Sequence, residues 1–236
     1  MTKMPAVIYA QRMVRDGHEF QEFLLRACHD LRAPLRSVRA NAELLLKVPE
    51  KREGPEFQQI LGFLANGAQT ADSLVDALAN YALSLHVEFS SLPVSSGALL
   101  RSVLMRLSAE VHASGAEVTY GELPHVPGDP DRLMQLFENL LRNAIQQRGE
   151  AAPRIHVSGQ QQGGGWIFSV QDNGRGIAAE DLERIFRPFE RLSSDRGGGG
   201  LGLAMCRAIV AGHGGRIWAE SVVGAGTTFY FTLAPV

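Results

Sequence analysis

The chain has 236 residues, of which 45% are hydrophobic, and its formal net charge is −2. This composition excludes an intrinsically disordered chain, and so small a charge gives no electrostatic reason to expect nucleic acid or an anionic membrane as the main partner. The two cysteines, Cys28 and Cys206, form neither a disulfide framework nor a zinc motif. No apolar run approaches the ~18 residues of a membrane span and no signal peptide is recognisable, so we expect a cytoplasmic protein.

Glycine is unevenly distributed along the chain. Five of the 25 glycines lie in the first hundred residues, whereas 16 lie between Gly159 and the C-terminus. A low-complexity chain would spread its glycines evenly, so the skew predicts two parts that make different demands on the backbone.

Apolar residues at alternating spacings of four and three predict two long helices in the first part of the chain. The first seam comprises Leu24, Cys28, Leu31, Leu35, Val38, Ala42 and Leu45, and the second comprises Phe57, Leu61, Leu64, Ala68, Ala71, Val75, Leu78, Ala82 and Leu85. The segment 48–55 between them contains two prolines, which predicts an antiparallel hairpin. One hairpin cannot cover both sides of such seams, so we expect two hairpins to pair into a four-helix bundle in a homodimer.

The rest of the chain mixes the two kinds of element. Strands are predicted over residues 87–93, 116–120, 154–158, 166–171, 216–221 and 227–233, and helices over 97–113, 129–148, 179–186 and 201–212. A loop is expected over 159–165. The fold class is therefore α+β, with a helical hairpin followed by a two-layer α/β sandwich that begins near residues 86–89.

A first candidate binding motif follows the strand predicted over 166–171. Asp172 could accept a hydrogen bond from an exocyclic amine such as that of adenine, while Gly174 and Gly176 would let the chain approach a flat ligand. An ordinary turn explains the same residues about equally well.

Two further segments are suited to phosphate and its counter-ion. The glycine run 197–200 leads straight into a helix, so its N–H groups can cradle phosphate; the alternative is a flexible linker. Asn139 and Asn143 share one helix face, and an amide oxygen there could bind Mg²⁺; the alternative is a plain polar surface.

Together and in this order, the segments resemble the ATPase domain of histidine kinases in the GHKL superfamily. Residues 139–143 resemble its N box, 172–176 its G1 box, 186–189 its F box and 198–202 its G2 box, and 224–229 match its last glycine motif. The resemblance implies a Bergerat-type fold that binds ATP and Mg²⁺, with Mg²⁺ on Asn143. It assigns to ATP the residues Asn139, Arg142, Asn143, Asp172, Gly174, Gly176, Ile177, Phe186, Gly198, Gly200, Leu201, Gly202 and Thr228.

The first helix narrows the family further. His29-Asp30-Leu31-Arg32-Ala33-Pro34-Leu35 resembles the H box of the dimerisation and phosphotransfer (HisKA) domains of these kinases. The resemblance covers about residues 15–236. It implies a lead-in over 1–14, a HisKA domain over 15–86 and a catalytic ATP-binding domain over 87–236.

A transmitter of this family implies a defined reaction. His29 would attack the γ-phosphate of ATP, Asp30 would act as the general base, and the phosphoryl group would pass to an aspartate on the receiver domain of a response regulator. Few residues precede Val14, so the signal is expected from an upstream sensor domain or from a separate protein. Segments 189–192 and 214–221 are similar to the transmitter regions of phytochrome-type bacterial kinases.

Three positions depart from the family pattern. Gln146 stands where Lys is usual, although Arg142 or Arg148 could replace that Lys, and Gly199 stands where Thr is usual. Ala33 replaces a residue that orients water, so we expect little phosphatase activity. Gln146 and Gly199 keep an alternative open, a weakly active kinase or an ATP-binding signalling scaffold. A Ser/Thr anti-sigma kinase shares the ATP fold but has no use for a histidine on a hairpin.

Overall fold

The computed structural model describes residues 27, 31–45, 54–86, 92–163, 165–192 and 200–233. The chain divides into two compact units, and the division falls within helix α2 (Pro55–His86), between Leu78 and Ala79. The domain boundary expected near 86–89 stays a prediction, because residues 87–91 lie outside the described ranges. Among the helices of the described residues, none has the length and apolar character that would let it cross a membrane.

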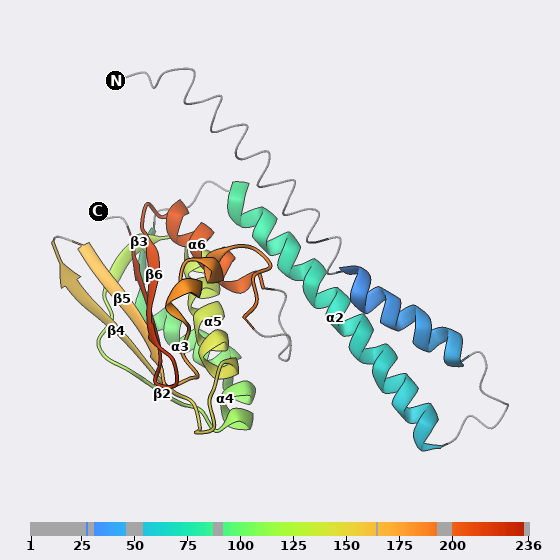
Figure 1. The fold of residues 1–236 in the computed structure, drawn as a ribbon. Coiled ribbons are helices and arrows are strands. Elements are labelled where there is room, and N and C mark those ends of the chain that lie inside the picture. Colours follow the sequence, from blue (N-terminus) through green and yellow to red (C-terminus); the bar gives the residue numbers. More distant parts are fainter. Residues whose placement is uncertain are drawn as a thin grey trace. The chain divides into compact units, whose positions relative to one another are not determined.

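The first unit contains a helix over residues 31–45 and most of α2, which lie side by side (Figure 1). A Cβ at Gly67 of α2 would lie 2.9 Å from Cγ2 of Val38 and 3.4 Å from the carbonyl oxygen of Pro34. The absence of a side chain at Gly67 therefore lets the two helices approach closely. The predicted hairpin is confirmed over these residues, whereas Leu24 and Cys28 of its first seam lie outside them.

The second predicted seam separates into two rows along α2. The row that is buried or half-buried within the unit comprises Phe57, Leu64, Ala71 and Leu78. The row that is exposed comprises Leu61, Ala68 and Val75. Val75 is 52% exposed, and Leu35 of the facing helix is 55% exposed. The hairpin by itself thus leaves apolar residues of both helices uncovered.

The second unit is a two-layer α/β sandwich. Its five-stranded sheet has the order β2-β4-β5-β7-β6, in which β2 is parallel to β4 and the other pairs are antiparallel. These strands are β2 (Glu117–Tyr120), β4 (Arg154–Gln162), β5 (Gly165–Asp172), β6 (Ile217–Val222) and β7 (Gly226–Thr232). A separate antiparallel pair joins β1 (Leu92–Ser95) to β3 (His125–Gly128).

One face of the five-stranded sheet is covered by α3 (Ser96–Arg106), α5 (Pro130–Gln146) and α6 (Gly202–Gly212), and α4 (Ser108–Ser114) follows α3 (Figure 1). The sheet and the helices both contribute fully buried side chains to the core, among them Phe168, Val170, Phe229, Phe231, Leu100, Phe137, Leu140 and Ile209. Phe168 and Phe231 stack with ring centroids 4.8 Å apart. The predicted α+β class, with its two-layer sandwich, is confirmed.

Three predicted elements differ from the observed ones, and one observed strand was not predicted. The helix expected over 97–113 is interrupted at Leu107, which leaves helical geometry and is fully buried. The loop expected over 159–165 is wrong: β4 and β5 continue as a hairpin through exposed glutamines that lie beyond the core. The helix expected over 179–186 is two 3₁₀ turns, η1 (Ala179–Asp181) and η2 (Arg184–Phe186). Strand β3 was not predicted, because it is four residues long and contains a proline.

Candidate nucleotide-binding site

Asp172 ends β5 on the inward face of the sheet. Phe168 and Val170 precede it on that face, so strand alternation carries the carboxylate inward, where the residue is only 6% exposed. Oδ1 of Asp172 accepts the N–H groups of Gly174 at 2.8 Å and Thr227 at 3.2 Å. Burial raises the pKa of Asp172 above its ordinary value, and these two hydrogen bonds oppose the rise. Within the described part of the chain no group donates to Oδ2, which leaves that oxygen for a ligand.

Three glycines around this carboxylate leave no room for a side chain. A Cβ at Gly174 would lie 2.5 Å from the carbonyl oxygen of Gln147, at the end of α5. A Cβ at Gly176, where φ is +72°, would overlap a carbonyl oxygen of β6, and one at Gly226, where φ is +118°, would overlap that of Asp172. The backbone after β5 therefore lies directly against α5 and against the β6–β7 turn.

Hydroxyl groups hold the same loop in place. Oγ of Ser221 accepts the N–H of Ile177 at 2.8 Å and donates to the carbonyl oxygen of Gly226 at 2.8 Å. Oγ1 of Thr227 lies 2.9 Å from this hydroxyl. Sequence reasoning missed Ser221 as a member of the site, because its role depends on a partner 44 residues away.

The sequence prediction named Thr228, and the structure brings Thr227 to Asp172 instead. Along β7, Thr227 and Phe229 are buried and face the helices. Thr228 alternates with them and pairs across the outer face with exposed residues of the neighbouring strands. The alternation with Phe229 and Phe231 was the signal that could have distinguished the two threonines. The assignment of Thr228 to ATP stays a prediction without a contact to support it.

One face of α5 connects the two ends of the candidate site. Nδ2 of Asn139 donates to Sδ of Met205 at 3.4 Å, and a Cβ at Gly202 would lie 3.5 Å from Oδ1 of Asn139. At the other end the carbonyl oxygen of Gln147 accepts a backbone N–H from the loop after Asp172 at 3.1 Å. Asn143 is half-buried and lies between them, one turn beyond Asn139 on the same face.

The segment before α6 is fixed at both of its ends. Phe186 is buried and makes an edge-to-face contact with Phe229, with ring centroids 6.2 Å apart. The N–H of Phe189 donates to the carbonyl oxygen of Gly200 at 2.8 Å, and both residues have positive φ, +62° and +65°. Leu201 is buried directly after them. The predicted residues that lie outside the described ranges are Gly198, His29 and Asp30.

Arg142 is held apart from these residues. Its Nη2 pairs with Glu110 of α4 at 3.0 Å and with Glu138 at 3.1 Å. The structure therefore directs this guanidinium toward α4 and does not bring it together with Asp172. Its assignment to ATP stays a prediction.

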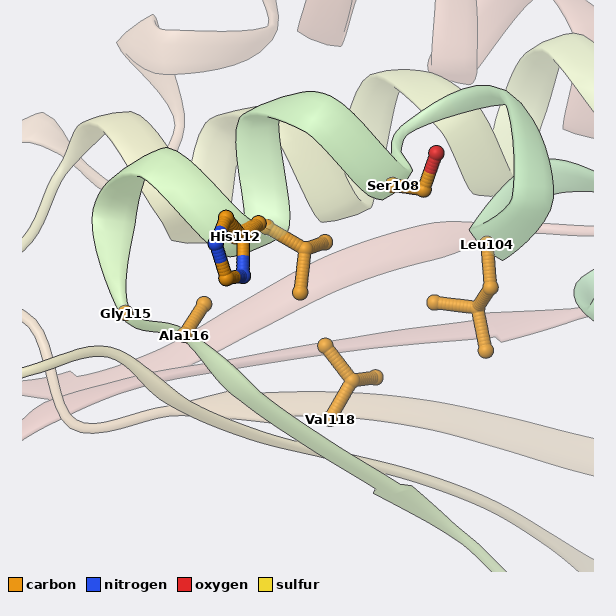
Figure 2. A pocket seen from close by; sticks show the side chains of 7 residues that line it. Leu104, Ser108, His112, Gly115, Ala116 and Val118 are labelled. Atoms are coloured by element: carbon orange, nitrogen blue, oxygen red, sulfur yellow. The ribbon is translucent and has the colours of Figure 1, made fainter.

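A cavity of about 540 Å³ lies elsewhere in this unit, between the α3–α4 segment and β2 (Figure 2). Its lining residues are Leu104, Ser108, Val111, His112, Gly115, Ala116 and Val118. None of the residues predicted to bind ATP lines it. We therefore locate the candidate nucleotide site by the residues that converge on Asp172 and not by this cavity.

Comparison with known proteins agrees with this geometry. Residues 128–236 match the family described as histidine kinase-, DNA gyrase B-, and HSP90-like ATPase. Phytochrome-like protein Cph1 of Synechocystis sp. is 34% identical over 95% of this chain, which spans 30% of the length of that protein. The solved catalytic domain of histidine kinase ThkA is 30% identical, with a TM-score of 0.53 over 62% of this chain and 95% of that chain. Full-length ShkA in complex with AMPPNP is 27% identical, with a TM-score of 0.63 over 90% of this chain and 45% of that chain.

The fold and the matched segment define an ATPase domain of the kind shared by histidine kinases, gyrase B and HSP90. The chain belongs to the histidine kinase family, with phytochrome-type and other sensor kinases among its relatives.

Proposed function

We propose that this chain is the kinase core of a two-component sensor, which phosphorylates His29 with ATP and passes the phosphoryl group to an aspartate of a response regulator. The observation that carries the proposal is the convergence of three separate segments on Asp172. Its own loop, the end of α5 and the β6–β7 turn meet there through backbone contacts that require glycine.

The geometry around Asp172 suits the adenine ring. Oδ2 of a buried carboxylate is a strong acceptor for an exocyclic amine, because a hydrogen bond there offsets the cost of burying the charge. The close contacts of Gly174 with Gln147 and of Gly176 with β6 hold the loop that carries this carboxylate in place. The phosphates would then extend along α5 toward Asn139 and Gly202, where the N-terminus of α6 favours negative charge.

Asn143 is the candidate protein ligand for Mg²⁺. The described residues contain no group of three or more His, Cys, Asp or Glu side chains that could hold a metal. Mg²⁺ takes oxygen ligands and commonly keeps phosphate oxygens and water, so one amide oxygen beside the triphosphate fits its chemistry. Bound Mg²⁺ would offset the charge of the phosphates, while Asn143 would fix its position along α5.

The transfer step rests on the resemblance of the H box, since His29 and Asp30 lie outside the described ranges. A ring nitrogen of His29 forms a bond to the γ-phosphorus, and the bond from that phosphorus to the bridging oxygen breaks as ADP leaves. Asp30 takes the proton from the other ring nitrogen. The receiver aspartate of the regulator then accepts the phosphoryl group.

Two copies of the chain would form the four-helix bundle. Uncovered apolar residues of the hairpin, among them Leu35 of the first helix and Leu61 and Val75 of the exposed row of α2, are 38–55% exposed and would be covered by a second hairpin. We place this dimeric core in the cytoplasm, downstream of a sensor domain or protein.

The test is phosphate incorporation into the full chain from γ-labelled ATP with Mg²⁺. We expect label that is lost in acid and stable in alkali, absent from His29→Ala and retained in His112→Ala, an exposed histidine of the other unit. Label that persists in His29→Ala would contradict the proposal. Nucleotide binding without any incorporation would instead favour the ATP-binding scaffold.

A further inference from the structure

Helices α5 and α6, which carry Asn139 and Gly202 of the candidate ATP site, are also joined by a buried histidine at the C-terminus of α6. His213 directly follows α6 and is 9% exposed. The buried polar or charged residues of the described chain are Ser96, Asp172, His213 and Thr227. Asp172 and Thr227 belong to the candidate site, whereas His213 has no part in the function proposed above.

Both ring nitrogens of His213 have partners, and these partners assign its proton. Nε2 lies 3.0 Å from the backbone N–H of Asp129, which can only donate, so Nε2 carries the lone pair. Nδ1 lies 2.8 Å from the carbonyl oxygen of Ile209, which can only accept, so Nδ1 carries the proton. The ring is therefore the neutral Nδ1–H tautomer.

These two bonds connect the end of α6 to the start of α5. Ile209 lies in the last turn of α6. Asp129 is the N-cap of α5, and its Oδ1 accepts the N–H groups of Asp131 and Arg132, each at 3.1 Å. Asp129 therefore caps α5 with its side chain and, through its backbone N–H, donates to Nε2 of His213.

The imidazole has little freedom to move from this position. A Cβ at Gly128 would lie 3.1 Å from both Cδ2 and Nε2 of His213, so the ring packs directly against the backbone of Gly128. Glycine at this position leaves the space that the ring occupies. The bond to Asp129 therefore fixes how far α6 can slide along α5.

The N-terminal end of α6 meets the middle of α5 at the candidate ATP site. Asn139 contacts Met205, and Gly202 lies beside the Asn139 amide. Asn139 is the tenth residue after Asp129, which corresponds to about 15 Å of helix. A rigid helix transmits an axial shift over that distance, so a change at His213 would alter the spacing between Asn139 and the N-terminus of α6.

We propose that His213 is a positioning residue for nucleotide binding: its Nε2 holds the N-cap of α5 and so sets the spacing between Asn139, in the middle of α5, and Gly202, at the N-terminus of α6. The inference rests on the proposed function, because it takes these two residues as part of the ATP site.

Two substitutions separate the two bonds of the ring. His213→Asn places an amide near Nδ1, so it can keep the bond to Ile209 within α6 but loses the bond to Asp129. His213→Gln places its amide oxygen near Nε2, so it can keep the bond between the helices. We expect ATP to bind about tenfold more weakly to His213→Asn and within about twofold of the unaltered chain to His213→Gln.

Calorimetric titration of the full chain with ATP and Mg²⁺ measures these affinities. Thermal unfolding of the same variants without nucleotide measures their stability. An ATP affinity within about twofold of the unaltered chain in both variants, or a loss of similar size in both, would overturn the inference, because only His213→Asn loses the bond to Asp129. If the unaltered chain binds no ATP, the proposed function itself fails.

A second measurement needs no substitution. The ¹⁵N chemical shifts of the His213 ring in the unaltered chain distinguish the two neutral tautomers. We expect Nδ1 to carry the proton. A proton on Nε2 would exclude the bond to Asp129 and overturn the inference, whether or not the variants fold.

Discussion

The two units of the chain differ in how completely each buries its own apolar side chains. In the α/β unit Phe137, Phe168 and Phe231 are at most 1% exposed, and the sheet and helices enclose one core. In the hairpin, residues of the same apolar kind remain about half exposed, Leu35 and Val75 among them. The α/β unit thus encloses its own core, whereas the hairpin leaves apolar side chains exposed on both of its helices.

Glycine illustrates the same difference between the units. In the α/β unit Gly174, Gly176 and Gly226 let loop backbones meet at Asp172. In the hairpin Gly67 lets two helices approach, and Gly62 has open space around it. A glycine is therefore indispensable where backbones meet at the candidate site and replaceable on the exposed face of the helix.

The largest expected effect comes from replacing one glycine in each unit. Gly176→Ala should destabilise the chain by about 3 kcal/mol, because a side chain at positive φ is strained and would overlap β6. Gly62→Ala should stabilise α2 by about 0.5–1 kcal/mol, since alanine favours a helix and meets no atom there. Denaturant unfolding of both variants measures the two effects, and equal effects would remove the distinction between the units.

The next effect concerns the oligomeric state. Leu61→Glu combined with Val75→Glu places charges on the exposed row of α2 and should weaken the dimer at least about a hundredfold. Leu92→Glu is the matched control, because Leu92 is similarly exposed at 54% but lies in the other unit. Sedimentation over a dilution series measures both. A double variant that stays dimeric would exclude the exposed row as the interface.

A smaller effect is expected from the two neighbouring threonines of β7. Thr227→Val removes the hydroxyl beside Ser221 and should weaken ATP binding by a factor of about five, the size expected for one lost hydrogen bond. Thr228→Val alters the outer face and should leave the affinity unchanged. Titration with ATP compares the two variants. The opposite ranking would restore the sequence prediction of Thr228.

The smallest expected effect is a gain in thermal stability when Asp172 of the candidate site is replaced by Asn. Burial raises the pKa of Asp172, so the ionised carboxylate destabilises the folded chain at neutral pH. Asp172→Asn can still accept the two backbone N–H groups, and without nucleotide it should unfold at the same or a slightly higher temperature. The advantage should shrink as the pH falls through the raised pKa of the native carboxyl and should be lost below the ordinary pKa of 3.8, where the carboxyl is neutral in both the folded and the unfolded chain. An advantage that grew on acidification would contradict this assignment.

The sequence predicts those features that depend on residues close together in the chain, such as helix spacing, helix starts and strand alternation. The seams of α2 follow from apolar spacing, α5 begins at Asp129 with Pro130 as expected, and strand alternation carries Asp172 inward. The order of the glycine motifs along the chain is enough to indicate the family.

The remaining features depend on partners far away in the sequence. The side of β7 on which Thr227 lies is set by its pairing with β6, and Arg142 is held by Glu110 on a different helix. Asp129 and His213 are 84 residues apart, so no local pattern joins them. The end of β4 carries no alternation, because Gln160, Gln161 and Gln162 are all exposed.

The central claim is that the motifs of the α/β unit converge on one ATP site at Asp172. Calorimetric titration of the full chain with ATP and Mg²⁺, compared between the unaltered chain and Asp172→Asn, tests this claim most directly. We expect one ATP per chain and at least about a hundredfold loss of affinity in the variant, with thermal stability retained. An Asp172→Asn chain that bound ATP as tightly as the unaltered one would contradict the account.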